Sequence, residues 1–294
     1  MHYNGPVIRP PHEAYSVIVE TTVGCTHNSC RFCTFYKGTP FHMAPLSQIE
    51  SDLQEAAAYN PHAPRVWASG GDPFTMATGK LVVLADLIRK YFPKANIAMY
   101  GRVDSMRNKT VEDIRLLRQH GINDLVIGIE TGDDDTLSLQ NKGYTAGEML
   151  KNLQMLEDGG MDYRIIYLAG IAGHERFVEN ARRTANLLNK LRPTFMYLTS
   201  LTIQEDSLLY KDIQSGRFQP QTELDKIKEF GLLIRDLKNP LEINATAGYN
   251  PIRFTAMLPQ DKEQLLKEIE KVVAGYTEET EERLALHRAR YGTV

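Results

Sequence analysis

The sequence predicts an α/β fold with a parallel sheet, either doubly wound or closed into part of a barrel. Two patterns lead to this prediction. Short apolar runs recur along the first two thirds of the chain, and an amphipathic helical pattern follows each run. The runs are continuous rather than alternating, which is typical of parallel strands that are buried on both faces.

Each strand and each helix of this fold has its own signal in the sequence. Two expected helix starts have the spacing of a capping box, Ser47 with Glu50 and Thr145 with Glu148. Each apolar run is followed by a helical pattern, as right-handed crossovers between parallel strands require. The expected strands are Val17–Val19, Val66–Ala68, Ile97–Tyr100, Leu125–Ile129, Ile165–Leu168 and Phe195–Leu198.

The strand–helix rhythm changes after about Leu201. Helical faces are expected around residues 224–237 and 265–272, and the segment 278–290 starts acidic and ends basic, as the helix dipole favours. Residues 244–259 are expected to be irregular. The predicted organisation is an N-terminal segment (1–13), a core (14–204) and a mostly helical C-terminal extension packed on that core (205–294).

The composition argues against several classes of function. A net charge of -3 and a pI near 6.3 give no basic excess, so we expect no nucleic-acid partner. No apolar run is long enough to span a membrane, and residues 1–11 lack the apolar core of a signal peptide. Three cysteines cannot all pair, so we expect reduced thiols and a cytoplasmic location.

All three cysteines, Cys25, Cys30 and Cys33, lie within nine residues. They are too close in sequence to join distant parts of a fold, but three thiolates can converge on one metal centre. The spacing Cys-x4-Cys-x2-Cys opens a plant-type ferredoxin site, which also needs a distant fourth cysteine that this chain lacks. The pattern therefore predicts a metal or cluster with three protein ligands and one open coordination position, as catalytic centres require.

His27 offers an alternative within the same stretch, because three cysteines and one histidine could close a tetrahedral zinc site. A structural zinc site, however, does not need unusual polar residues on the neighbouring strands. Such residues follow several expected strands, at the edge where parallel α/β folds bind ligands. They are the turn Gly70–Pro73, Arg102 with Asp104, and Glu130, whereas Arg164 begins its apolar run.

Each of these residues also has a structural interpretation. The turn Gly70–Pro73 could be only a tight turn, and Arg102 with Asp104 could be a solvated surface pair. Glu130 directly ends an apolar strand, so its carboxylate needs a partner or a ligand. Arg164 would point inward only if its side chain lies on the inner face of the sheet.

These residues resemble the radical S-adenosylmethionine enzymes, specifically the group related to oxygen-independent coproporphyrinogen dehydrogenases and elongator-type radical proteins. In that family a cysteine triad after the first strand holds a [4Fe–4S] cluster. Cys25, Cys30 and Cys33 match the triad, and Phe32 matches the aromatic residue that usually precedes its last cysteine. The loop departs from the commonest family spacing, Cys-x3-Cys-x2-Cys, by one extra residue. The resemblance implies a partial (βα)6 TIM-like barrel.

The resemblance also implies which residues bind S-adenosylmethionine. Gly70, Gly71 and Asp72 resemble the family's Gly-Gly-Glu turn, which receives the methionine ammonium. By the same match Glu130 would contact the ribose or methionyl part of the cofactor, and Lys142 its carboxylate.

Two arginines complete the implied cofactor contacts. Arg102 and Arg164 fall where related enzymes place further contacts, although the residue types at these positions differ.

The reaction implied by the resemblance is reductive cleavage of S-adenosylmethionine to methionine and a 5′-deoxyadenosyl radical. That radical would abstract hydrogen from a substrate, which we expect to be a small molecule. An external donor of the flavodoxin or ferredoxin type would supply the electron. No further cysteine exists for an auxiliary cluster. The sequence identifies neither the substrate nor a residue that acts on it.

Overall fold

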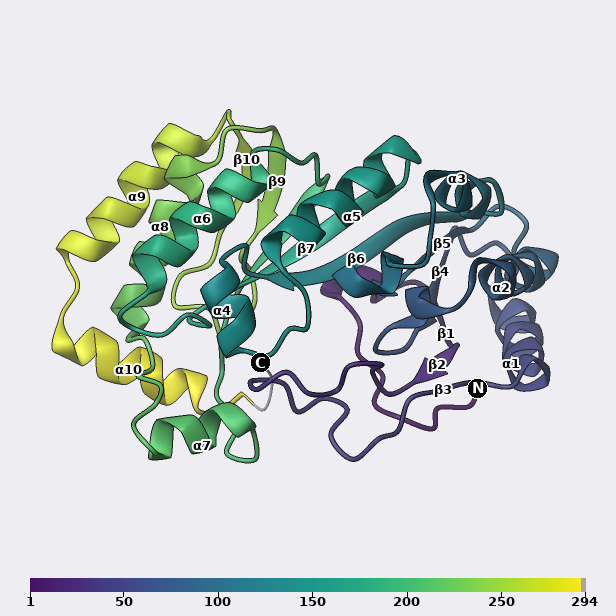
Figure 1. Cartoon of the computed structure of the whole chain (residues 1–294), viewed down its shortest axis with the longest axis horizontal. Helices are drawn as coiled ribbons and strands as arrows, with labels where there is room; N and C mark the ends of the chain where they lie inside the picture. Colours follow the sequence, from purple (N-terminus) through teal and green to yellow (C-terminus); the bar gives the residue numbers. More distant parts are fainter. Residues whose placement is uncertain (292–294) are drawn as a thin grey trace. The chain divides into compact units, whose positions relative to one another are not determined.

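The computed structural model describes residues 1–291 of the chain, which form an α/β fold made of two compact units (Figure 1). Unit 1 contains Met1–Asn28, Phe35–Gly128 and Lys151–Tyr163. Unit 2 contains Ser29–Thr34, Ile129–Leu150 and the chain from Arg164 onward. The cysteine loop and two of the strands therefore each contribute residues to both units.

Unit 1 is built on parallel strands, with its helices α1, α2 and α3 side by side (Figure 1). Strand β4 pairs with β1 and β5, and β5 pairs with β6. The strands are β1 (Val17–Glu20), β4 (Arg65–Ser69), β5 (Asn96–Gly101) and β6 (Ile122–Glu130), and β2 (Thr22–Val23) pairs separately with β3 (His42–Met43). The helices are α1 (Leu46–Tyr59), α2 (Thr78–Tyr91) and α3 (Val111–Gln119), with short 3-10 turns at Pro11–Glu13, Pro73–Thr75 and Val103–Met106.

Unit 2 continues the same architecture and adds a C-terminal region. Strands β7, β8 and β9 are parallel, and β10 is antiparallel to β9. These strands are β7 (Asp162–Ala169), β8 (Phe195–Ser200), β9 (Leu241–Asn244) and β10 (Thr255–Leu258). The helices are α4 (Asp134–Leu139), α6 (Phe177–Leu188), α7 (Leu208–Gln214), α8 (Glu223–Asp236), α9 (Lys262–Ala274) and α10 (Glu278–Arg288). Helix α5 (Ala146–Asp158) begins in unit 2 and continues in unit 1 from Lys151.

All six predicted strands are present, as β1, β4, β5, β6, β7 and β8, and the predicted parallel α/β class is confirmed. Their centres are buried on both faces; Val66, Trp67 and Ala68, for example, are fully buried. This burial explains the continuous apolar runs in the sequence. The division of the chain at residues 13 and 204 stays a prediction.

Two local predictions need correction. Helix α1 begins at Leu46 after Pro45, so Ser47 lies inside the first turn and does not cap the helix. The stretch expected to be irregular, residues 244–259, contains β10 and the end of β9. Each of these strands has only four residues and buries alternate ones, a pattern too short to recognise.

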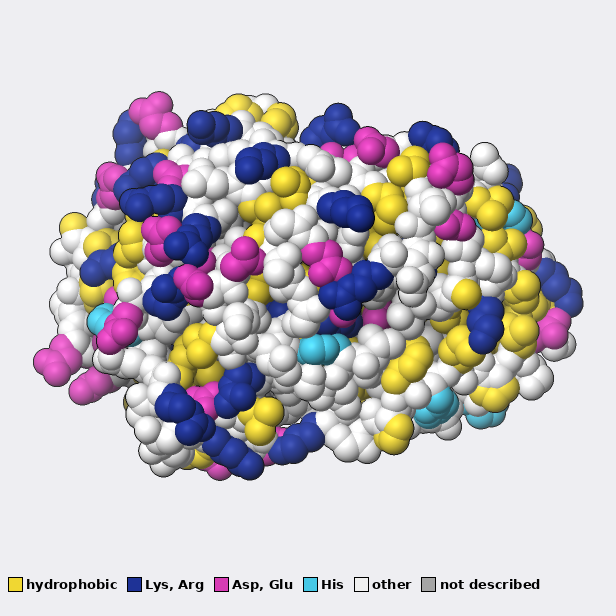
Figure 2. Space-filling model, in the orientation of Figure 1, with side chains coloured by type: hydrophobic (Ala, Val, Ile, Leu, Met, Phe, Trp, Pro, Cys, Tyr) yellow, Lys and Arg dark blue, Asp and Glu magenta, His cyan; other side chains and the backbone are white. Residues whose placement is uncertain are grey.

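The other predicted cap is present, because the backbone N–H of Glu148 donates to Oγ1 of Thr145 at 3.2 Å. Within residues 1–291, no helix combines the length and the apolar composition needed to cross a membrane. Acidic and basic side chains are interspersed over most of the face in Figure 2, and several Lys and Arg side chains gather at its lower left, over α7.

Candidate cofactor site

The cysteine loop connects β2 with β3 and carries Cys25, Cys30 and Cys33, all three half-buried. Cys25 belongs to unit 1, and Cys30 and Cys33 belong to unit 2. In the part of the chain that the structure describes, no three His, Cys, Asp or Glu side chains gather closely enough to hold one metal ion. The three cysteines therefore stay predicted ligands.

In unit 1 the Gly-Gly turn packs directly on the backbone that leads into Cys25. The N–H of Gly71 donates to the carbonyl of Gly24 at 3.1 Å. A Cβ atom at Gly71 would lie 2.5 Å from that carbonyl oxygen, and one at Gly70 would lie 2.0 Å from Oγ1 of Thr22. Because no larger residue fits, both glycines are needed to bring the turn against the cysteine loop.

Asp72 follows this turn and is almost fully buried. Its Oδ2 accepts a hydrogen bond from Oγ1 of Thr26 at 2.5 Å, and its Oδ1 accepts from Oγ of Ser105 at 2.5 Å and from the N–H of Arg102 at 3.3 Å. Burial raises the pKa of Asp72 to about 6, against the lowering effect of these partners. Asp72 thus ties the residue after Cys25 to the segment that follows β5.

The guanidinium of Arg102 contacts the carboxylate of Asp104, with 2.9 Å between Nε and Oδ1. The two side chains are only 9% and 17% exposed, so the interpretation of a solvated surface pair is wrong. Since Arg102 also meets Asp72 through its backbone, the structure brings the turn and this arginine together.

Lys109 is a residue of this region that the sequence did not reveal. Its Nζ donates to the carbonyl of Met76 at 2.9 Å and lies 4.9 Å from the ring centroid of Phe74. Burial lowers the pKa of Lys109 to about 8. It fixes the short 3-10 turn after Asp72. No motif in the sequence indicates this role of Lys109, because Lys109 and Met76 are distant in the sequence and only the fold brings them together.

In unit 2 the structure brings together Phe32, Glu130 and Lys142. Nζ of Lys142 lies 3.3 Å from Oε1 of Glu130, and their side chains are 4% and 13% exposed. The same ammonium lies 5.7 Å from the ring centroid of Phe32 and 5.6 Å from that of Tyr144, within reach of cation–π attraction. A buried ion pair therefore lies against the aromatic residue next to Cys33.

The backbone around Lys142 also binds the cysteine loop directly. The carbonyl of Gln140 accepts from the N–H of Arg31 at 3.0 Å, and Nδ2 of Asn141 donates to the carbonyl of Ser29 at 3.0 Å. Asn141 has φ of 52°, in the left-handed region. The sequence did not single out Asn141, although asparagine is one of the few residues that adopt this conformation readily.

The other side of the loop is fastened to α7. Arg31 binds Asp212 through two nitrogens, each at 2.6 Å from a carboxylate oxygen. Cys30 and Cys33 pack against an apolar cluster, so the two thiols have an apolar wall on one side. The cluster consists of Phe32, Leu168, Ile171, Leu201, Leu209 and Phe218.

Arg164 is the third residue of β7, and its guanidinium lies 3.3 Å from the hydroxyl of Tyr197 and over the ring of Phe195. Its residue partner across the sheet is Phe195, at the amino end of β8. A role of Arg164 in cofactor binding stays a prediction.

Comparison with known proteins bears on what this arrangement does. Residues 19–186, more than half of the chain, match the family model described as the radical SAM superfamily. The chain is 19% identical over 201 residues to the heme chaperone HemW of Bacillus subtilis, covering 66% of this chain and 52% of HemW. It thus spans only about half the length of this curated relative.

Two solved structures share the fold. Methylornithine synthase (PylB) matches with a TM-score of 0.55 and 14% identity, over 77% of this chain and 63% of PylB. Elp3 of the archaeon Methanocaldococcus infernus matches with a TM-score of 0.52 and 14% identity, over 88% of this chain and 64% of that one. The family match, with this fold, leads to one conclusion. The chain belongs to the radical SAM superfamily of enzymes, whose cofactors are a [4Fe–4S] cluster and S-adenosylmethionine.

Proposed function

We propose that the chain holds a [4Fe–4S] cluster through Cys25, Cys30 and Cys33 and binds S-adenosylmethionine beside it. The donor set fits such a cluster, because all three cysteines are half-buried and close in sequence. The observation that carries the proposal is the buried Glu130–Lys142 pair against Phe32, the residue before Cys33. An ion pair at this position offers one group of each sign to a zwitterionic ligand.

The proposed contacts with S-adenosylmethionine are those that the family resemblance implies. In unit 1 the backbone of Gly70 and Gly71 would receive the methionine ammonium, aided by the Asp72 carboxylate. In unit 2 Lys142 would bind the cofactor carboxylate, and Glu130 its ribose or methionyl part. Phe32, Arg102 and Arg164 complete the proposed set.

When bound, the cluster and S-adenosylmethionine supply a one-electron reductive cleavage that yields a 5′-deoxyadenosyl radical. The chain's own residues bind and orient. Asp72 holds Thr26 next to Cys25, and Asn141 holds Ser29, so both halves of the cysteine loop are fixed. The apolar cluster behind Cys30 and Cys33 keeps water away from them on that side.

The partners belong to the same proposal. A small-molecule substrate would provide the hydrogen atom, and an external flavodoxin or ferredoxin type of donor would provide the electron. The net charge of -3 gives no basic excess for nucleic acid, so no nucleic-acid partner is proposed. Reduced thiols suit a cytoplasmic location.

The experiment is anaerobic reconstitution with iron and sulfide, followed by a chemical reductant and S-adenosylmethionine. Brown protein that releases 5′-deoxyadenosine supports the proposal. Cys33→Ala should abolish the cluster, whereas His27→Ala, a matched change in the same loop, should leave it intact. Colourless protein that holds one zinc ion per chain and releases no 5′-deoxyadenosine would refute it.

A further inference from the structure

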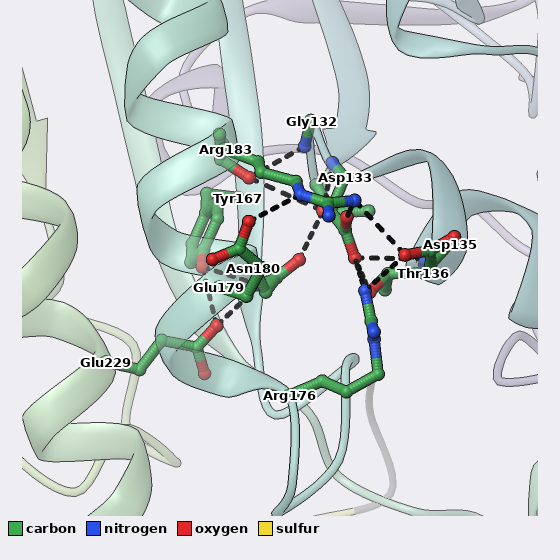
Figure 3. Close-up of polar contacts among 12 residues, drawn as sticks. Gly132, Asp133, Asp135, Thr136, Tyr167, Arg176, Glu179, Asn180, Arg183 and Glu229 are labelled. Atoms are coloured by element: carbon green, nitrogen blue, oxygen red, sulfur yellow. Dashed lines mark hydrogen bonds and ion pairs between the residues drawn. The ribbon is translucent and has the colours of Figure 1, made fainter.

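Figure 3 shows a hydrogen-bond network that includes Gly132, Asn180 and Glu229. The network begins at the two residues that follow Glu130, the last residue of β6. The hydroxyl of Thr131 donates to Oδ1 of Asn180 at 2.5 Å. Oγ1 of Thr184 accepts from the N–H of Gly132 at 2.8 Å. Asn180 and Thr184 both lie on α6, so side chains of this helix are hydrogen-bonded to the two residues that follow Glu130.

Asn180 also makes a hydrogen bond to Glu229 on α8. Its Nδ2 donates to the Tyr167 hydroxyl at 2.9 Å and to Oε1 of Glu229 at 2.7 Å, and that hydroxyl donates to the same oxygen at 2.6 Å. The other oxygen of Glu229 accepts from the N–H of Gly170 at 3.0 Å. Because each of these partners donates to the Glu229 carboxylate, Asn180 can present its amide in only one orientation.

Asp133 anchors the next turn of the same segment. Its carboxylate accepts from Arg176 at 2.9 Å and from Arg183 at 2.8 Å, and it caps α4 by accepting from the N–H of Thr136 at 3.1 Å (Figure 3). Burial alone would raise the pKa of Asp133, but the bonds from Thr136 and Arg176 outweigh it and hold the pKa below its usual range. The segment after β6 is therefore fixed along its length.

This segment begins and ends with unusual backbone conformations. Glu130 has φ of 62° and Asn141 has φ of 52°, both in the left-handed region that residues other than glycine seldom adopt. Such conformations persist only where the surrounding structure enforces them. Glu130 itself belongs to the Glu130–Lys142 pair, and Asn141 directly precedes Lys142.

We propose that Asn180 and Glu229 are positioning residues: through Thr131 they hold Glu130 in its left-handed conformation, with its carboxylate beside Lys142. They act on the cofactor only through Glu130. The inference rests on the proposed role of Glu130 and Lys142 in binding S-adenosylmethionine. It assigns a function to a buried polar network that lies on α6, α8 and β7, outside the cofactor contacts.

The first test replaces Asn180 by Ala in the full chain. Reconstituted Asn180→Ala should bind S-adenosylmethionine about 10-fold more weakly by calorimetry, because Thr131 loses its acceptor. In the cofactor-free protein, amide hydrogen exchange over residues 130–142 should become faster.

The matched control is Asn189→Ala, at the end of the same helix. The side chain of Asn189 donates to the carbonyl of Asp236 and accepts from the N–H of Lys238, but it makes no hydrogen bond to the network. It should lower the melting temperature and leave both the cofactor affinity and the exchange over 130–142 unchanged.

A charge swap tests the network without removing volume. Asn180→Asp alone places two carboxylates together. Glu229→Gln alone sets its new N–H donors against either Nδ2 of Asn180 or the N–H of Gly170, so each single variant should weaken binding. In the double variant the new amide at position 229 can donate to the new carboxylate at position 180 and to Tyr167, and the Tyr167 hydroxyl can donate to that carboxylate. Because every bond of the triangle is then reversed but satisfied, the double variant should recover an affinity within about threefold of the wild type.

Two results would overturn the inference. One is a wild-type affinity in Asn180→Ala, and the other is a double variant no better than its single variants. If the unaltered protein does not bind S-adenosylmethionine at all, the proposed function fails instead. Amide hydrogen exchange still tests the positioning role of the network in that case. Exchange over residues 130–142 must be faster in Asn180→Ala than in Asn189→Ala, and equal rates would refute the role.

Discussion

Each of the two units holds an acidic candidate residue in place, and the two units do so in different ways. In unit 1 the acidic residue Asp72 is turned inward, and neutral hydroxyl groups of Thr26 and Ser105 hold it. In unit 2 the acidic residue Glu130 pairs with Lys142 beside an aromatic ring. In unit 1 the Asp72 carboxylate holds neighbouring segments of the chain in place. In unit 2 the left-handed backbone at Glu130 holds the Glu130 carboxylate beside Lys142.

The physical cost of the two arrangements also differs. Unit 1 depends on glycines that leave room for close backbone approach, and burial raises the pKa of its carboxyl group. Unit 2 stores strain at Glu130 and Asn141 and balances it with a buried polar network. Changes in unit 1 should therefore act mainly on stability, and changes in unit 2 mainly on cofactor affinity.

The largest expected effect is at Gly70. Gly70→Ala should lower the free energy of unfolding by about 4 kcal/mol, because φ is 150° and the new Cβ would meet Thr22. Urea denaturation measures this change. Gly79→Ala, where the added Cβ has open space, should change stability by less than about 1 kcal/mol. Equal effects at the two glycines would show that close packing does not explain Gly70.

The second effect concerns pH. The pKa of Asp72 is about 6 in the folded protein and 3.8 in its ordinary state, so the folded state binds the proton more tightly. The stabilisation from the protonated Asp72 carboxyl group is complete below pH 3.8. It is lost as the pH rises through 6, which lowers the free energy of unfolding by about 3 kcal/mol. Asp72→Asn removes this titration. The stability difference between wild type and variant should therefore shift toward the variant by that amount between about pH 4 and 6.5, and a constant difference would contradict the raised pKa.

A smaller effect, on affinity rather than stability, is expected at Lys142. Lys142→Met keeps the apolar stem but removes the charge, and should weaken S-adenosylmethionine binding about 30-fold, or about 2 kcal/mol. Lys267→Met, which removes an exposed lysine paired with Glu263, is the control and should leave the affinity unchanged. Similar cluster content in both variants would place the loss in cofactor binding, and an unchanged affinity in Lys142→Met would remove Lys142 from the site.

The smallest expected effect is at Ser105 in unit 1, on the free energy of unfolding. Ser105→Ala removes one donor to Asp72 and should lower the free energy of unfolding by about 1 kcal/mol, with cofactor affinity nearly unchanged. Thermal unfolding and calorimetry measure the two quantities. A loss of affinity larger than the loss of stability would mean that the Asp72 carboxylate contributes more to cofactor binding than the backbone of Gly70 and Gly71 does.

The six parallel strands and most of the helices could be predicted because each depends on local patterns of apolar residues. The cap at Thr145 was predicted correctly for the same reason, whereas Pro45 overrode the expected cap at Ser47. Strands β9 and β10 could not be predicted, since four residues with alternate burial carry too weak a signal.

By itself the sequence determined the parallel α/β class, the three-thiolate loop and the family resemblance, because these depend on residue type and on spacing along the chain. Only the tertiary structure decided what each charged group touches. It turned Asp72 toward Thr26 and Ser105, placed Lys142 between Glu130 and Phe32, and joined Thr131 to Asn180 and Glu229. Such contacts join residues far apart in the sequence and depend on burial, so local sequence patterns do not predict them.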